Sequence, residues 1–158
     1  MTHETATFAA GCFWGVEQAF RDMKGVVETE VGYTGGRTDN PTYEEICRKA
    51  TGHAEAVRVT FDPSVVTYDD LLNQFWTIHD PTQENRQGPD VGDQYRTAIF
   101  THNQTQLDAA KTSLTTEDKS GRHARAITTK ISPTEVWWKA EEYHQQYFEK
   151  NGGGACKI

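Results

Sequence analysis

The chain lacks long apolar runs and clusters of basic residues. No apolar run approaches the ~20 residues that a membrane-spanning helix needs, so the sequence predicts no membrane contact. Lys and Arg are scattered along a chain of net charge −7, which does not favour nucleic-acid binding, because phosphate contacts need clustered basic side chains. The start, Met1-Thr2-His3-Glu4, lacks the basic and apolar regions of a signal peptide. We therefore expect a cytoplasmic protein.

Cysteine is also scarce. The chain has three cysteines, at positions 12, 47 and 156, and an odd number placed so far apart does not indicate a structural disulfide framework. It has no Cys-x-x-Cys pair and no paired histidine spacing, so a zinc-binding module is a weak alternative. We expect no bound metal or cofactor. Three isolated cysteines suit transient redox chemistry instead.

The rest of the composition is that of an ordinary folded domain. Of 158 residues, 35% are hydrophobic and 11% aromatic, enough to bury roughly two-thirds of the unfolded surface. No internal repeat or interior low-complexity segment divides the chain. We predict a single domain over residues 1–158, monomeric by default. Within it, residues 150–158 are predicted to be a flexible tail, because three consecutive glycines precede Cys156.

Hydrophobic spacing predicts strands mixed with helices. The strands are expected at 5–9, 27–33, 55–61, 95–100 and 126–131, and the helices at 13–23, 68–79, 103–119 and 135–148. Thr42 with Glu45 has the pattern of a capping box and predicts one more short helix, and Thr67 is expected to cap the helix at 68–79. Residues 80–94 are polar with several Gly and Pro, which favours a functional loop. The sequence predicts an α+β domain of two layers.

Cys12 occupies the most informative position. It lies where the apolar stretch 5–10 meets the first predicted helix, so it falls near the first turn of that helix. Unpaired N–H groups and the helix dipole stabilise a thiolate there. The flanking Gly11 and Gly15 allow a tight turn and leave the sulfur accessible. A small buried core cysteine is the alternative for any single cysteine, but this placement favours a nucleophile.

Glu55 is the second informative position. On the strand 55–61, alternation places it on the same face as Val57, Val59 and Phe61, which should face the core. A carboxyl at the mouth of that core would be partly desolvated, its pKa would rise, and it would suit a proton donor near neutral pH. A strand-end glutamate that reaches solvent is the alternative. His53, two residues earlier, is interpreted as a structural histidine.

Several further side chains could serve a site, although none is specific alone. Tyr43 and Tyr95 carry phenols that can donate a hydrogen bond to an oxygen, and Asp90 lies in the polar loop. Cys156, on its glycine tether, could reach a distant thiol, or it could be an incidental cysteine in a disordered tail. Cys47 lacks the glycine bracket and is interpreted as a spectator. The C-terminal aromatic residues are interpreted as core packing: Trp137, Trp138, Tyr143, His144 and Tyr147.

Five ordered blocks of the sequence contain the residues that could form such a site. The first is Gly11-Cys12-Phe13-Trp14-Gly15, and the next two are Tyr43-Glu44-Glu45-Ile46-Cys47 and Thr51-Gly52-His53-Ala54-Glu55-Ala56-Val57. The others are Gly88-Pro89-Asp90-Val91-Gly92-Asp93-Gln94-Tyr95-Arg96-Thr97-Ala98-Ile99 and Ala140-Glu141-Glu142-Tyr143-His144-Gln145-Gln146-Tyr147. In this order, the five blocks resemble those of the A-type peptide methionine sulfoxide reductases. The likeness runs from about Phe8 to Tyr147, and five ordered blocks are far more specific than one cysteine motif.

The resemblance implies a fold and a set of roles. The fold would be a two-layer sandwich with a ferredoxin-like core, long added loops and a mobile C-terminal tail. Cys12 would be the nucleophile, and Phe13 and Trp14 would hold the substrate methyl group. The remaining roles concern the sulfoxide oxygen and the second thiol: Glu55, Tyr43 and Tyr95 would hold and protonate the oxygen, Asp90 would orient the site, and Cys156 would be the resolving thiol.

The implied reaction is the reduction of methionine sulfoxide, free or in proteins, at the S epimer. Cys12 would become a sulfenic acid, condense with Cys156 to a disulfide and be recycled by thioredoxin, with no bound cofactor. A thiol peroxidase would also use a reactive and a resolving cysteine, but it would need neither a methyl-sized aromatic pocket nor a carboxylic acid. A redox sensor that does not turn over is a third possibility.

Overall fold

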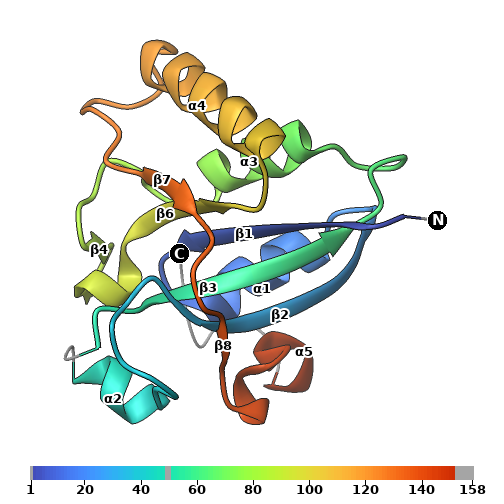
Figure 1. Ribbon diagram of the computed structural model, residues 1–158. Coiled ribbons are helices and arrows are strands. Elements are labelled where there is room, and N and C mark those ends of the chain that lie inside the picture. The colour runs from blue at the N-terminus through green and yellow to red at the C-terminus, as the bar shows by residue number, and fades with distance from the viewer. Residues whose placement is uncertain (1, 49–50, 152–158) are drawn as a thin grey trace.

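The fold is organised around one mixed sheet (Figure 1), seen in a computed structural model that describes residues 2–48 and 51–151. Its six strands lie in the order β7-β6-β1-β3-β2-β8, and every neighbouring pair is antiparallel except β6 and β7. The strands are β1 Glu4–Ala10, β2 Val26–Thr34, β3 Ala54–Phe61, β6 Thr97–Thr101, β7 Lys130–Pro133 and β8 Trp138–Lys139.

The central four strands and two helices form a ferredoxin-like core. In chain order they are β1, α1 (Phe13–Arg21), β2, β3, α3 (Tyr68–Thr77) and β6, and in the sheet the four strands lie in the order β6-β1-β3-β2. This β-α-β-β-α-β arrangement is the ferredoxin-like motif. Helix α4 (Gln104–Lys119) packs against α3 and β7. The predicted α+β fold with a ferredoxin-like core is confirmed.

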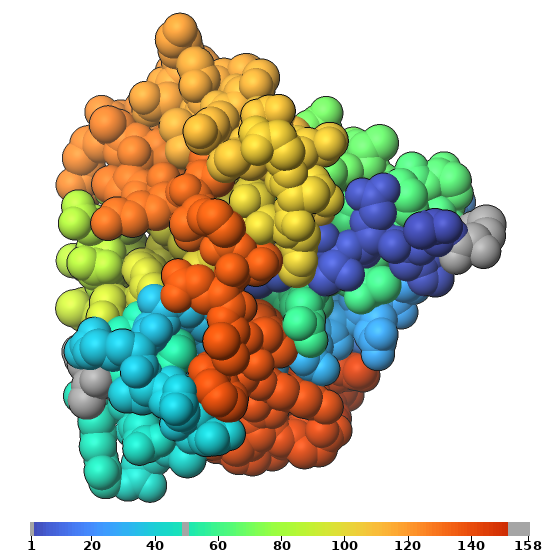
Figure 2. Space-filling view, in the orientation of Figure 1, coloured from blue at the N-terminus to red at the C-terminus, as the bar shows by residue number. Residues whose placement is uncertain are grey.

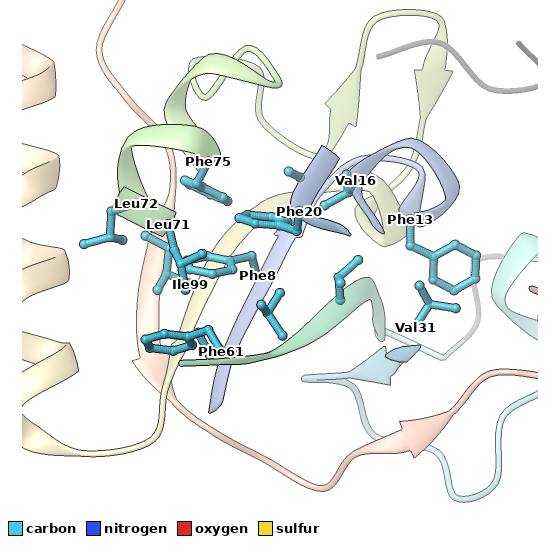
Figure 3. Packing of buried hydrophobic residues seen from close by; sticks show 14 of the residues in the cluster. Phe8, Phe13, Val16, Phe20, Val31, Phe61, Leu71, Leu72, Phe75 and Ile99 are labelled. Carbon is cyan, nitrogen blue, oxygen red and sulfur yellow. The ribbon is translucent and has the colours of Figure 1, made fainter. Parts of the chain in front are cut away.

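Strand alternation divides the core between the two faces of the sheet. On β1, Phe8 faces α1 and α3 and stacks on Phe20 with ring centroids 5.0 Å apart (Figure 3). Val57, Val59 and Phe61 of β3 join the same cluster, as the alternation predicted. Burial of each such side chain contributes about 1.5–3 kcal/mol, so the sheet and the two helices are held mainly by this layer.

The opposite face of the sheet is lined mostly by small side chains. Ala9, Ala54, Ala56, Ala98 and Phe100 form a second buried cluster, against which Trp137 packs. Arg58 lies 4.7 Å from the Trp137 ring centroid on the same face. The small residues therefore leave room for the segment after β7 to cross the sheet, and Figure 2 shows this orange segment on the molecular surface beside the cyan residues that follow β2.

The two predicted helix caps, Thr42 and Thr67, are confirmed. Thr42 and Glu45 form a capping box at the start of α2 (Tyr43–Cys47), and Thr67 forms one with Asp70 at the start of α3. Helix α1 ends two residues before the predicted end. The chain turns at Gly25, which has φ +99°, and a Cβ there would lie 2.7 Å from Val66. The turn has room only for glycine.

Two predicted strands differ from the observed ones by more than one residue at an end. Tyr95 belongs to a 3-10 turn, η1 (Asp93–Tyr95), and β6 begins only at Thr97. The last predicted strand, 126–131, is wrong over residues 126–129, because β7 covers Lys130–Pro133. Thr128 instead donates its backbone N–H to the carbonyl of Pro81. A tertiary hydrogen bond to the long loop replaces pairing with β6 at this point.

The predicted helix at 135–148 is wrong. This segment contains β8, a 3-10 turn η2 (Glu142–His144) and the start of α5 (Tyr147–Asn151). Its backbone and side chains bond to β2 instead: Ala140 donates to the Val31 carbonyl, and the Gln145 amide pairs with both backbone groups of Val31. These bonds satisfy an otherwise open sheet edge, and that tertiary gain exceeds a weak helix preference.

The polar segment 80–94 is a folded loop. It contains a two-stranded ribbon, β4 (Arg86–Gln87) and β5 (Asp90–Val91), and the Gln87 amide bonds to both backbone groups of Asp80. Gln87 is buried, and its Cγ would lie 3.0 Å from a Cβ placed on Gly11. The loop therefore packs against the turn before Cys12. Within residues 2–48 and 51–151, no helix is long and apolar enough to cross a bilayer.

Candidate active site

Cys12 lies at the junction that the sequence predicted. Strand β1 ends at Ala10, Gly11 turns with φ +101°, and Cys12 is the N-cap residue of α1. Its side chain is half-buried. The first turn of α1 presents backbone N–H groups here and carries no acidic side chain. In the reduced protein, this environment favours a negative charge on the sulfur.

Glu55 is buried directly beside the start of α1. Its carboxyl is 1% exposed, and Oε1 accepts a 3.2 Å hydrogen bond from the backbone N–H of Phe13. Oε2 has no hydrogen-bond partner within the described part of the chain. Burial raises the pKa of Glu55 to about 8, the charge of Asp90 also raises it, and the Phe13 bond opposes the shift. Glu55 is therefore a protonated acid at neutral pH with one oxygen available.

The two predicted phenols lie around this carboxyl. Tyr43 begins α2 and Tyr95 ends η1, and both are half-buried. Burial raises the pKa of Tyr95 to about 12, and the charges of Glu55 and Asp90 add to the shift. Burial, Glu55 and a hydrogen bond to Cys47 raise the pKa of Tyr43 above its ordinary value. Both phenols keep their protons over the physiological range and can donate to an oxygen.

An aromatic wall adjoins the carboxyl and the sulfur. Phe13 is buried and packs against Tyr33 and His144, with centroids 5.7 and 5.2 Å away. Trp14 stacks on Tyr147 at 3.9 Å, with the ring planes 9° apart. These rings give the site an apolar side that can hold a small alkyl group and exclude water.

His144 fixes the indole of Trp14, a contact that the sequence did not reveal. Its Nδ1 accepts a 2.8 Å hydrogen bond from Trp14 Nε1, although 130 residues separate them. His144 is fully buried, and burial lowers its pKa to about 4. The imidazole is therefore neutral, with its proton on Nε2, which has no hydrogen-bond partner among the described residues. The sequence interpretation placed His144 in the aromatic packing, with a hydrogen bond there as a possibility, but it did not identify Trp14 as the partner.

Glu141 is a second residue that the sequence did not single out. Oε1 accepts from the Tyr33 hydroxyl and Oε2 from the backbone N–H of Tyr43, both at 2.8 Å. These bonds join the C-terminal segment to the start of α2. A local signal was present, since a helix N-terminus favours an acidic partner, but nothing local shows that the partner lies 98 residues away.

The three cysteines differ in position. Cys47, at the end of α2, is a free and exposed thiol. Cys156 lies outside the described residues, so the pairing of Cys12 with Cys156 stays a prediction. Among residues 2–48 and 51–151, no group of three His, Cys, Asp or Glu side chains is placed to hold a metal ion.

The site combines four features: a sulfur at a helix start, a protonated carboxylic acid, two phenol donors and an apolar wall. Together they can hold a polar oxygen and protonate it while a thiolate attacks the adjacent atom. The class of protein defined by this fold and site is a thiol-dependent oxidoreductase with an α+β core.

Comparison with known proteins identifies the family. The family model described as peptide methionine sulfoxide reductase matches residues 4–158. The chain is 61% identical over 154 residues to the peptide methionine sulfoxide reductase MsrA of Geobacter sulfurreducens, covering 98% of this chain and 95% of that protein. It is 58% identical to the MsrA of Methanoculleus marisnigri, covering 98% and 94% of the two chains. The chain belongs to the peptide methionine sulfoxide reductase family.

Solved structures agree with this assignment. Methionine sulfoxide reductase A of Corynebacterium diphtheriae has a TM-score of 0.90 and 41% identity, covering 98% of this chain and 77% of that one. Reduced Mxr1 from Saccharomyces cerevisiae has a TM-score of 0.89 and 37% identity, covering 98% and 89%. Mxr1 in complex with Trx2 matches with a TM-score of 0.64 and 25% identity, covering 99% and 87%.

Proposed function

We propose that this chain is a peptide-methionine (S)-S-oxide reductase that reduces methionine sulfoxide, free or in proteins, to methionine. The enzyme would repair oxidised proteins and use thioredoxin as its reductant. Its family membership and the site around Cys12 support this activity. The S stereochemistry follows from the resemblance of the five sequence blocks.

The observation that carries the proposal is the protonated Glu55 carboxyl beside the N-cap Cys12. A sulfoxide has a polar S–O bond and an electrophilic sulfur, which a thiolate can attack if the oxygen is protonated. Glu55 Oε1 accepts a hydrogen bond from the backbone of Phe13, the residue that follows Cys12. Its other oxygen, Oε2, can carry and donate that proton. Tyr43 and Tyr95 then stabilise the charge on the oxygen.

The first step transfers oxygen from substrate to enzyme. The Cys12 thiolate attacks the sulfoxide sulfur and forms an S–S bond while Glu55 protonates the oxygen. The S–O bond then breaks as the oxygen passes to the Cys12 sulfur, and the S–S bond breaks to release methionine and leave a sulfenic acid on Cys12. The substrate sulfur is reduced by two electrons and Cys12 is oxidised by two. Phe13 and Trp14 hold the substrate methyl group in the apolar part of the site, and Asp90 orients the groups around the oxygen.

The second half regenerates the thiol. The Cys156 thiol attacks the sulfenic sulfur and passes its proton to the departing hydroxyl group, so that water leaves and a Cys12–Cys156 disulfide forms. A thioredoxin dithiol reduces this disulfide by exchange and is itself oxidised. The solved complex of the related Mxr1 with Trx2 supports thioredoxin as the partner. The proposed enzyme carries no resident cofactor and acts as a cytoplasmic monomer of one domain, independent of membranes and nucleic acid.

The test presents each separate epimer of a methionine sulfoxide peptide to the reduced protein with a dithiol and counts methionine formed. We expect turnover of the S epimer only, lost in Cys12→Ser and retained in Cys47→Ser as the matched cysteine control. Turnover of hydrogen peroxide without turnover of either sulfoxide would favour a thiol peroxidase. Oxidation of Cys12 without any turnover would indicate a sensor.

A further inference from the structure

Arg96, the residue after Tyr95, holds three separate backbone segments together. Its Nη1 donates to the carbonyls of Gly52 at 3.0 Å and Asp93 at 2.9 Å, and Nη2 donates to the carbonyl of Gly35 at 3.4 Å. The guanidinium is mostly buried, and burial lowers its pKa from the ordinary value. No carboxylate in the described part of the chain pairs with it within 4.0 Å. This half-buried cation is satisfied by backbone carbonyls.

Each of the three carbonyls lies on a segment that leads to the active site. Gly35 begins the bend after β2, Gly52 precedes Glu55 by three residues, and Asp93 begins the turn that presents Tyr95. The fit at Gly35 is close, because a Cβ there would lie 2.9 Å from Arg96 Nη2. The guanidinium therefore joins the base of the Glu55 strand to the base of the Tyr95 turn.

His53 also links two of these segments by hydrogen bonds. Its Nδ1 accepts from the backbone N–H of Gly36 at 2.9 Å, and its Nε2 lies 2.7 Å from the carbonyl of Thr38. His53 thus ties the turn after β2 to the segment before β3 without reaching the Tyr95 turn. Among the side-chain hydrogen bonds of the described residues, those of Arg96 are the ones that connect all three segments.

We propose that Arg96 is a positioning residue for sulfoxide reduction, which acts by holding the Tyr95 phenol at its working distance from the Glu55 carboxyl. The proposal rests on the proposed function. A planar guanidinium presents its donors in a fixed fork, which a lysine ammonium cannot reproduce across three carbonyls. A displacement of a donor by a fraction of an ångström to 1 Å is enough to slow a positioned reaction.

The effect works through geometry and not through the charge of Arg96. The groups that shift the pKa of Glu55 are its own burial, Phe13 and Asp90, and Arg96 is not among them. The Tyr95 phenol likewise responds to Glu55, Asp90, Cys47 and Gln94. A variant that loosens the fork should therefore slow oxygen protonation without moving the pH at which Glu55 loses its proton.

The test is a double-mutant cycle between Arg96→Lys and Tyr95→Phe, read as the single-turnover rate of methionine release. Because Arg96 acts through Tyr95, we expect Arg96→Lys to slow the wild-type enzyme about tenfold and the Tyr95→Phe enzyme at most about twofold. The pH above which the rate falls should not change. Equal slowing in both backgrounds, or no slowing at all, would overturn the proposal.

Two further variants separate this effect from loss of folding. Arg58→Lys is the matched control, since Arg58 is a partly exposed guanidinium that bonds to Glu30 and lies over Trp137 on the face of the sheet opposite Glu55. The rate of this variant should stay at the wild-type value. If Arg96→Lys does not fold, Gly35→Ala displaces the same guanidinium by the contact at 2.9 Å and should show the same dependence on Tyr95. If the wild-type protein releases no methionine from either sulfoxide epimer, the proposed function itself is rejected.

Discussion

The backbone N–H of Phe13 donates a hydrogen bond to the side chain of Glu55, 42 residues away in the chain. The bond fixes one carboxyl oxygen at the first turn of α1 and leaves the other without a partner in the described part of the molecule. Because Cys12 is the preceding residue, one helix start positions both the sulfur and the acid. The thiol and the proton donor are thus held by the same rigid element.

Glu55→Gln should slow the formation of the Cys12 sulfenic acid by about 10²-fold at pH 7, the usual effect of removing a general acid. With a pKa of about 8, the wild-type acid is protonated below that pH and loses its proton above it. The wild-type rate should therefore fall as pH rises through about 8, whereas the rate of the variant should show no such fall. The measurement is single-turnover methionine release from pH 6 to 9.5, and equal rates at pH 7 would remove Glu55 from the mechanism.

The same carboxyl should make stability depend on pH. Its folded pKa is raised, so the folded protein binds the proton more tightly than the unfolded chain, and the stabilising contribution is complete below the ordinary carboxyl pKa. It is lost as pH rises to about 8, at up to about 1.4 kcal/mol per pH unit. Glu55→Gln should therefore melt higher than wild type at pH 9, with a smaller difference at pH 5. A constant difference across this range would contradict a buried protonated carboxyl.

His144→Phe should weaken substrate binding by freeing the Trp14 indole. The variant keeps an aromatic ring but removes the Nδ1 acceptor of the 2.8 Å bond, so we expect KM to rise about tenfold, as for a net loss of about 1–1.5 kcal/mol. Because the pKa of His144 is about 4, KM should not titrate through this residue between pH 6 and 8. His102→Phe is the control, since His102 bonds to Thr7 on the opposite face of the sheet.

Cys156→Ser should release about one methionine per enzyme and then stop, leaving a sulfenic acid on Cys12. A dimedone-type probe and mass spectrometry would locate that acid. Cys47→Ser should turn over with thioredoxin as the wild type does. Sustained thioredoxin-driven turnover in Cys156→Ser would contradict the assignment of Cys156 and would show that another thiol, with Cys47 the available one, resolves the sulfenic acid.

The local sequence determined much of this molecule. The Thr42 and Thr67 capping patterns predicted where α2 and α3 begin, because a cap is satisfied by residues within one turn. Strand alternation predicted that Glu55 shares its face with Val57 and Val59, because the side chains of a strand alternate whatever it packs against. The five sequence blocks then pointed to the family that the comparisons show.

Only the tertiary structure decided the contacts that join distant segments. The C-terminal segment is not the predicted helix, because hydrogen bonds to the edge of β2 at Val31 outweigh its local preference. The same is true of the bond between Trp14 and His144 and of the Arg96 fork, whose partners are set by the folded backbone. A local pattern encodes periodicity and capping. It does not encode which distant carbonyl a buried donor will meet, because that depends on how the sheet and loops pack together.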